Sequence, residues 1–118
     1  MKKSEIIELG EKYFSQFENK DISSLKNFYS EEIILFDPII KNVSGIENVL
    51  LVNSIFFEKT KKIIIKSKKL FVDYYSNTLI AEIEIQFDNN LVNLVDIIEF
   101  NSNKKIIKIT AYLDSQQI

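Results

Sequence analysis

The stretch TLIAEIEIQFD, residues 78–88, decides how the rest of the sequence is interpreted. Every second side chain from Leu79 to Phe87 is apolar, and acidic or amide side chains occupy most of the positions between them. Alternation with a period of two is typical of a β-strand that has one buried and one solvated face. The stretch therefore predicts a strand of an antiparallel sheet that is covered on one side.

Further strands are predicted on both sides of this stretch. Apolar segments with many β-branched residues begin at Ile63, and another one covers residues 91–100. Turn-forming residues separate the segments at Ser76–Asn77, Asn89–Asn90 and Asn101–Lys104. The region from Ile63 onward is therefore expected to form four antiparallel strands in a meander.

The N-terminal segment, residues 4–19, has helical periodicity instead. Its apolar side chains recur every three or four positions, and they include Ile6, Leu9, Tyr13 and Phe17. This spacing predicts an amphipathic helix, for which Ser4 is the expected N-cap.

A second, shorter helix is predicted after Asp21, which has a side chain suited to an N-cap. Tyr29 is expected near the end of this helix. A short strand, residues 33–36, follows and stops at Asp37, because Pro38 cannot continue a hydrogen-bonded ladder inside a sheet. Asp37 is therefore expected at a strand end.

A third helix is predicted from Ser44 and Glu47, which have the S-x-x-E spacing of a capping box, to about Phe57. Helices followed by strands in a chain of 118 residues indicate an α+β fold. We expect one domain, residues 1–118, in which three N-terminal helices pack on one face of a curved antiparallel sheet.

The composition restricts the chemistry of the protein. The sequence contains no Cys, His, Trp or Arg, so all 15 basic residues are lysines. A thiolate nucleophile, a histidine base and a sulfur-ligated metal are thereby excluded. Acid–base chemistry would have to use carboxyl, tyrosine or lysine groups with shifted pKa values. No cofactor or metal is implied.

Charge and hydropathy restrict the partners. A formal net charge of -2 and the absence of arginine argue against a nucleic-acid-binding protein. The lysines between Lys59 and Lys69 are interpreted as a solvated turn and strand face, with an anion-binding patch as the alternative. No apolar segment has the length of a membrane span or a signal peptide. We therefore expect a cytoplasmic protein.

Asp96 interrupts the apolar face of the predicted strand 91–100. Alternation places it on the same side as Val92, Leu94, Ile98 and Phe100. An ionised carboxylate there would be costly to desolvate, so the group should be paired, hydrogen-bonded or neutral through a raised pKa. Two interpretations remain: a carboxyl group in a wet cavity or bonded to the backbone, and a functional acid.

Two longer segments resemble a known family. The first is KYFSQFENKDISSLKNFYSEEIILFDP, residues 12–38, and the second is VDIIEFNSNKKIIKITAYLD, residues 95–114. They resemble the N-terminal half and the closing hairpin of ketosteroid isomerases and SnoaL-like polyketide-cyclase proteins, in the nuclear transport factor 2-like superfamily. The resemblance implies the cone-shaped, cystatin-like fold of that superfamily.

The resemblance also implies roles for individual residues. Tyr13 matches the oxyanion-hole tyrosine of the isomerases, Asp37 their proton-shuttling base, and Asp96 their protonated oxyanion-hole aspartate. Tyr29 falls where some members have a supporting tyrosine. A cofactor-independent isomerase or lyase acting on a small hydrophobic or carbonyl-containing ligand is implied. The alternative is a non-catalytic small-molecule binding or association module of the same fold.

Departures from the family narrow the expected chemistry. Hydrolysis like that of limonene epoxide hydrolases needs an arginine, and dehydration like that of scytalone dehydratases needs histidines; the sequence has neither. Ile39, Ile40 and Lys41 follow where the steroid enzymes have a small loop with glycine. This difference argues against a substrate as large as a steroid.

A homodimer is predicted from the second face of strand 91–100. Val95 and Ile97 lie on the side away from Asp96, and that side is apolar as well. Helices can cover one face of a sheet, so a second copy of the chain is the expected cover for the other.

Overall fold

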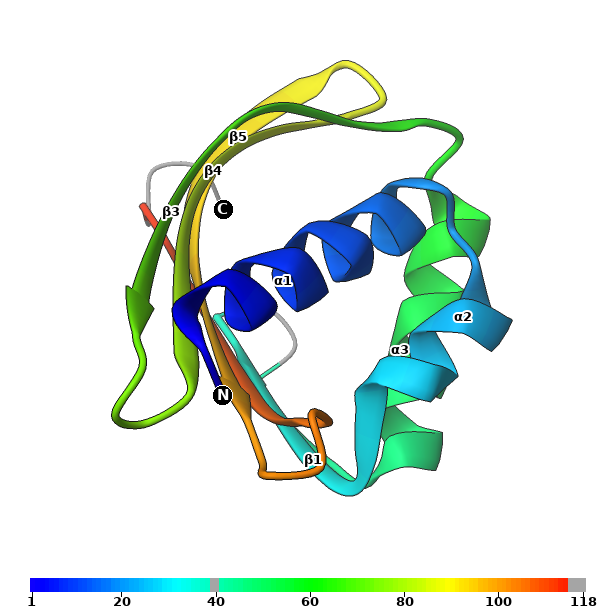
Figure 1. Ribbon diagram of the computed structural model, residues 1–118. Helices are drawn as coiled ribbons and strands as arrows, with labels where there is room; N and C mark the ends of the chain where they lie inside the picture. Colours follow the sequence, from blue (N-terminus) through cyan, green and yellow to red (C-terminus); the bar gives the residue numbers. More distant parts are fainter. Residues whose placement is uncertain (39–40, 115–118) are drawn as a thin grey trace.

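The structure, a computed structural model, describes residues 1–38 and 41–114. Its helices are α1 (Lys3–Glu18), α2 (Ile22–Phe28) and α3 (Ile46–Lys59). Its strands are β1 (Tyr29–Asp37), β2 (Lys41–Ser44), β3 (Ile63–Asp73), β4 (Thr78–Phe87), β5 (Asn90–Phe100) and β6 (Ile106–Leu113). Figure 1 shows the strands bending around the helices.

The strands form a six-stranded sheet in the order β2-β1-β6-β5-β4-β3. Strands β3 to β6 are antiparallel neighbours, which confirms the predicted meander. Strand β1 runs parallel to β6, and β2 pairs antiparallel with β1 at the edge. The sheet is therefore mixed, with two strands more than the meander.

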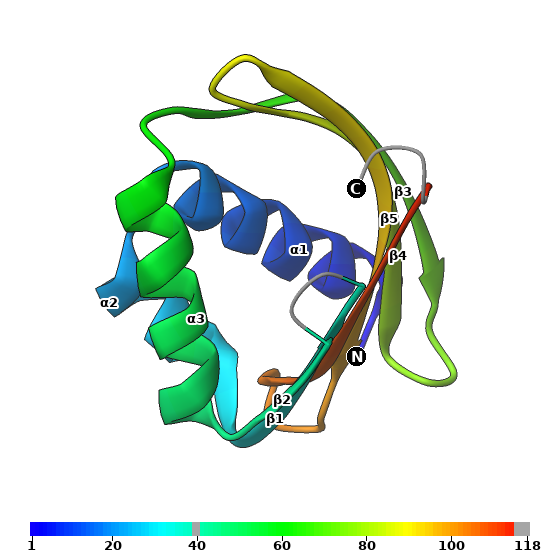
Figure 2. The same ribbon diagram turned by 180° about the vertical axis from the view of Figure 1, so that it is seen from behind.

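The helices cover one face of the sheet. α1 lies across the concave side of β3, β4 and β5 (Figure 1), and the view from behind shows α3 in the foreground, with its first turn next to β1 and β2 (Figure 2). The inward side chains of β4, among them Leu79, Ala81, Ile83 and Ile85, are buried. The alternation in residues 78–88 thus reports the buried face correctly, and the predicted α+β architecture is confirmed.

The curvature of β3 is fixed where α1 ends. The pairing of β3 with β4 shifts register between Ile65 and Ser67, which marks a β-bulge. The backbone N–H of Ile65 donates to the Glu18 carboxylate at 2.6 Å. The last turn of α1 is therefore bonded to the bent strand.

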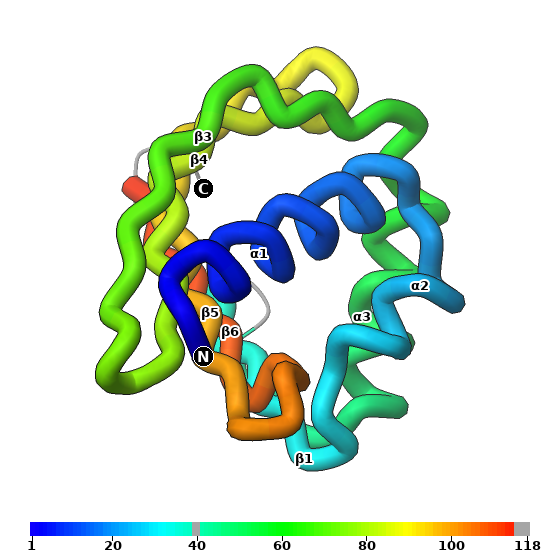
Figure 3. Tube along the Cα trace, in the orientation of Figure 1, coloured from blue at the N-terminus to red at the C-terminus, as the bar shows by residue number. Residues whose placement is uncertain are grey.

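Lys20 connects the turn after α1 to the end of α3. Its backbone has a φ of 56°, and its Nζ donates to the carbonyl oxygens of Phe57 and Lys61 at 3.2 and 3.1 Å and to that of Thr60. These carbonyl groups belong to the end of α3, where helical partners are missing. The Cα trace shows the two segments side by side (Figure 3).

The helix starts differ in part from the prediction. Asp21 caps α2 as expected, because its carboxylate accepts from the backbone N–H of Ser24 at 3.1 Å. Ser4 was the wrong cap for α1: the N-cap is Lys2, and its backbone N–H donates to the Glu5 carboxylate at 3.1 Å.

The predicted capping box of Ser44 and Glu47 is wrong. Ser44 is the last residue of β2, a short strand that was not predicted, and the N-cap of α3 is Gly45, without a side-chain hydrogen bond. Gly45 has a φ of 90°, a conformation that only glycine adopts readily. Tyr29 was also misplaced, because it begins β1 instead of ending α2.

Gly10 lets α1 approach the sheet closely. A Cβ atom at this position would lie 2.1 Å from Cδ2 of Leu79, which is fully buried in β4. Because the surrounding core leaves Leu79 no free space, a larger residue at position 10 would have to push α1 away from the sheet.

We expect Gly10→Ala to lower the free energy of unfolding by about 1–2 kcal/mol. The overpacking cost of about 1–3 kcal/mol exceeds the gain of up to about 1 kcal/mol in helix propensity. Urea denaturation measures the difference, with Ser15→Ala on the exposed side of α1 as the matched control. A Gly10→Ala variant as stable as the wild type would contradict this account of the contact.

Candidate functional site

A cavity of about 380 Å³ lies between the helices and the inner face of the sheet. Its wall is mainly apolar and comes from α1, α3, β1 and β3 to β6. A volume of this size is in the range of small-molecule sites.

Five polar residues of the described ranges line the cavity, namely Tyr13, Tyr29, Asp37, Asn53 and Asp96. They come from α1, β1, α3 and β5. The structure thus brings together all four residues that were singled out from the sequence and adds Asn53.

Asp96 points into the cavity from the middle of β5. Its cross-strand neighbours are Ala81 on β4 and Ala111 on β6, whose small side chains leave room for the carboxyl group. The side chain keeps some accessible surface because it lines the cavity, but protein atoms surround it closely. Burial, and next the negative charge of Asp37, raise the pKa of Asp96 to about 7.

Asp37 ends β1, as the sequence predicted, and pairs there with Lys41 of β2. Its side chain is half-buried and lines the same cavity as Asp96. The two carboxyl groups lie on the inner face of the same sheet, on β1 and β5 with β6 between them. One wall of the cavity thus carries a carboxyl group with a pKa near 7 and a second carboxyl group two strands away.

The side chains of Tyr13 and Tyr29 are buried beside Asp96. Tyr29 donates to Oδ1 of Asn53 at 2.7 Å. Burial is the largest cause of a raised pKa for both tyrosines, and the charge of Asp96 acts in the same direction. Both groups are therefore protonated at neutral pH.

Asn53 was missed by the sequence interpretation. It is 7% exposed and lies on the buried side of α3 between Val49 and Phe57, one helical turn away in each direction. An amide at helical spacing between two buried apolar residues is the same kind of signal as the interruption at Asp96. The Asn53 side-chain oxygen is the acceptor that fixes the direction of the Tyr29 hydrogen bond.

Aromatic rings form the other end of the cavity. Phe56 of α3 contacts Phe17 of α1 and Phe87 of β4, with ring centroids 6.2 and 5.0 Å apart. All three rings line the cavity. The cavity thus has a polar end around Asp96 and an apolar, aromatic end.

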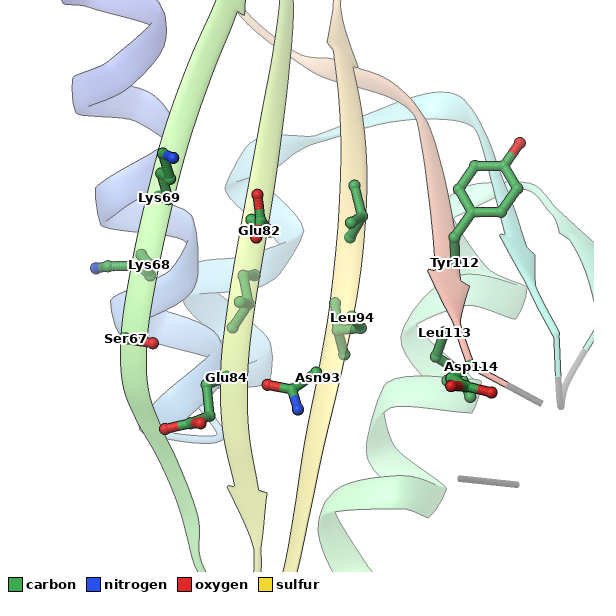
Figure 4. A pocket seen from close by; sticks show the side chains of 12 residues that line it. Ser67, Lys68, Lys69, Glu82, Glu84, Asn93, Leu94, Tyr112, Leu113 and Asp114 are labelled. Carbon is green, nitrogen blue, oxygen red and sulfur yellow. The ribbon is translucent and has the colours of Figure 1, made fainter. Parts of the chain in front are cut away.

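A second hollow, of about 670 Å³, lies on the outer face of the sheet. Figure 4 shows the helices behind the strands in this view, with Lys69, Glu82 and Tyr112 on the side toward the viewer. Cross-strand pairing puts these three residues in one row with Val95. The hollow is open to water and lined by charged groups, so the enclosed inner cavity is the better candidate for ligand chemistry.

Metal and membrane features are absent from the described ranges. No group of three or more Asp and Glu side chains in residues 1–38 and 41–114 is arranged to hold a metal ion. In the same ranges, no helix combines the length and hydropathy needed to cross a membrane. Ile39 and Ile40, on which the argument about steroid-sized substrates depends, lie outside the described residues.

Solved structures with the same architecture identify the fold. A proposed SnoaL-like polyketide cyclase from Shewanella putrefaciens CN-32 matches with a TM-score of 0.84 and 12% sequence identity, over 96% of this chain and 82% of that one. A nuclear transport factor 2-like protein of unknown function from Burkholderia xenovorans LB400 matches with a TM-score of 0.79 and 20% identity, over 97% and 86%. This chain has the nuclear transport factor 2-like fold.

A third solved structure has the same architecture. It is a proposed ketosteroid isomerase from Kribbella flavida DSM 17836, with a TM-score of 0.79 and 12% identity, over 95% of this chain and 79% of that one. No family model and no curated protein matches the sequence. At these identities the likeness shows the fold, and the activity has to be argued from the cavity.

We expect Asp96 to make stability depend on pH. Its pKa is raised from 3.8 to about 7, so between these pH values the folded state holds a proton that the unfolded chain has released. Stability therefore falls as pH rises through this window, by at most about 4 kcal/mol. Asp96→Asn lacks this term and should gain stability relative to the wild type from pH 4 to pH 8.

Urea denaturation of the two proteins at several pH values tests this expectation. The difference in unfolding free energy isolates Asp96 from the other carboxyl groups, which both proteins share. Parallel curves over the whole range would show that Asp96 titrates alike in the folded and unfolded states.

Proposed function

We propose that the protein is a cofactor-independent isomerase or lyase that moves a proton next to the carbonyl group of a small hydrophobic ligand. The observation that carries the proposal is the pair of carboxyl groups in one apolar cavity, of which Asp96 has a pKa of about 7. An acid near its pKa at neutral pH can donate to a developing charge, and an ionised partner can act as a base.

In the proposed reaction, the Asp37 carboxylate accepts a proton from the carbon next to the carbonyl group. The electrons of the broken C–H bond form the enolate double bond, and the carbonyl oxygen becomes negative. The protonated Asp96 carboxyl donates a hydrogen bond to this oxygen. Asp37 then returns the proton to a different carbon in an isomerisation. General base catalysis contributes about 10²–10⁴ in rate, and one oxyanion donor about 10²–10³.

Tyr13 is proposed as the second donor to the enolate oxygen, with Tyr29 as its support. Both hydroxyl groups keep their protons at neutral pH because burial raises their pKa. Asn53 holds Tyr29 in place beside Tyr13 through the 2.7 Å hydrogen bond.

One hydrogen bond favours the alternative, a non-catalytic binding or association module. Tyr29 donates to Asn53, so the proton of this hydroxyl group is used within the protein. A cavity of this kind can hold a hydrophobic ligand without chemistry. A measurement of whether the protein catalyses exchange of the α-protons of a ketone decides between the two functions.

We expect the wild type to catalyse exchange of the α-protons of 2-tetralone for deuterium in D₂O, as followed by NMR. Asp37→Asn should lower the rate by about 10² or more, because the amide cannot accept the proton. Glu84→Gln, on the outer face, is the matched control for loss of a carboxylate and should leave the rate unchanged. Undiminished exchange in Asp37→Asn would remove Asp37 from the mechanism, and no exchange with wild type would favour the binding module.

We also propose a homodimer that uses the outer face of the sheet. An apolar row crosses five strands there, formed by Phe71, Ile80, Ile97, Thr110 and Phe36. In the adjacent row Tyr112 is 60% exposed and lies beside Val95. Helices α1 to α3 cover the opposite face, so a second copy is the proposed cover for these side chains.

Sedimentation equilibrium at micromolar concentration tests the homodimer. We expect a mass twice the 13.8 kDa of the chain for the wild type and a shift to the monomer for Val95→Lys, because lysine would place a charge in the interface. Leu51→Lys, at an exposed position on α3, is the control and should remain dimeric. A wild type that stays at 13.8 kDa would refute the proposal.

A further inference from the structure

The ionisable groups of the cavity wall include acidic side chains but no basic ones among the described residues. Among the described residues that line it, two carry carboxyl groups and none is a lysine. The segments outside the described ranges, 39–40 and 115–118, contain no lysine in the sequence either. A ligand with a carboxylate or phosphate would therefore meet carboxyl groups of its own sign in a mainly apolar wall.

The cavity is also polar at one end and aromatic at the other. Along β5, Asp96 and Val92 both line the cavity and are four residues apart, which corresponds to about 13 Å. Val92 pairs with Ile85, two residues before Phe87, which contacts Phe56, while the charge of Asp96 acts on Tyr13 and Tyr29. A ligand that fills this space has a polar head and an apolar body.

We infer that the cavity binds a hydrophobic amine in its protonated form, with the ammonium group at Asp96 and the hydrocarbon body against Phe17, Phe56 and Phe87. The carboxylate supplies the ion pair, and the tyrosine rings near it supply faces that attract a cation. This ligand class goes beyond the proposed proton transfer, with which it shares only the cavity.

The raised pKa of Asp96 has a consequence for binding of an ammonium group. An ammonium group beside the carboxyl offsets the burial and the charge of Asp37 that keep it protonated. The titratable side chains that face Asp96 are Tyr13 from α1 and Tyr29 and Asp37 from β1; its neighbours on β4 and β6 are alanines. Near neutral pH, binding of the amine should therefore release a proton from Asp96.

Three probes with one bicyclic skeleton test the charge preference in the wild type: 2-aminotetralin, 2-tetralone and tetralin-2-carboxylic acid. Titration calorimetry at pH 7 should give an affinity for the amine at least tenfold higher than for the ketone and no measurable binding of the acid. Calorimetry in two buffers of different ionisation enthalpy should show proton release with the amine alone. Equal affinities for amine and acid would overturn the inference.

Variants assign the preference to Asp96. Asp96→Asn has nearly the same shape and should lose at least tenfold in amine affinity, a larger loss than in its affinity for the ketone, to which the amide can still donate. Glu84→Gln removes one carboxylate from the outer face and should bind all three probes like the wild type. Unchanged amine affinity in a folded Asp96→Asn variant, checked by circular dichroism, would overturn the inference.

The readouts separate this inference from the proposed reaction. Tight amine binding without exchange of any ketone supports the inference and refutes the reaction. Exchange of 2-tetralone without a preference for the amine supports the reaction and refutes the inference.

Discussion

The close contact between Gly10 of α1 and Leu79 of β4 is the constraint on which the cavity depends. It holds the first half of α1 directly on the sheet. Tyr13 and Phe17, on the following turns, face the cavity, and Glu18 bonds the end of the helix to the bulge in β3. The helix is thus fixed at both ends and spans the hollow of the bent sheet between them. A cavity can therefore lie beside the later turns of α1 while the turn at Gly10 stays closely packed on the sheet.

The polar end of this space is arranged by residues from four elements. Two alanines make room for the Asp96 carboxyl group, and burial and next the charge of Asp37 raise its pKa to about 7. Asn53 orients the hydroxyl group of Tyr29. Each group has its protonation or direction set by a neighbour, which is the kind of preorganisation that both catalysis and selective binding need.

The sequence predicted the helices, the meander and the inward position of Asp96 because alternation and helical spacing are local properties. It could not place β2 or the parallel pairing of β1, since a four-residue edge strand and a long-range partner leave no periodic signal. The start of α3 was misjudged because a glycine conformation replaces the cap that Ser44 and Glu47 suggested. The family resemblance singled out four residues that line one cavity in the structure, whereas the hydrogen bond from Tyr29 to Asn53 required three dimensions.

The parallel pairing of β1 with β6 has a consequence for how the protein is made. Leu35 pairs with Ile109, so this segment of the chain waits for one that is synthesised much later. Contacts between segments so distant along the chain form late and slowly. Asp37 follows Leu35 on the same strand and can join Asp96 only when this pairing is complete. A nascent chain therefore exposes the apolar inner face of β1 on the ribosome, the stage at which aggregation competes with folding.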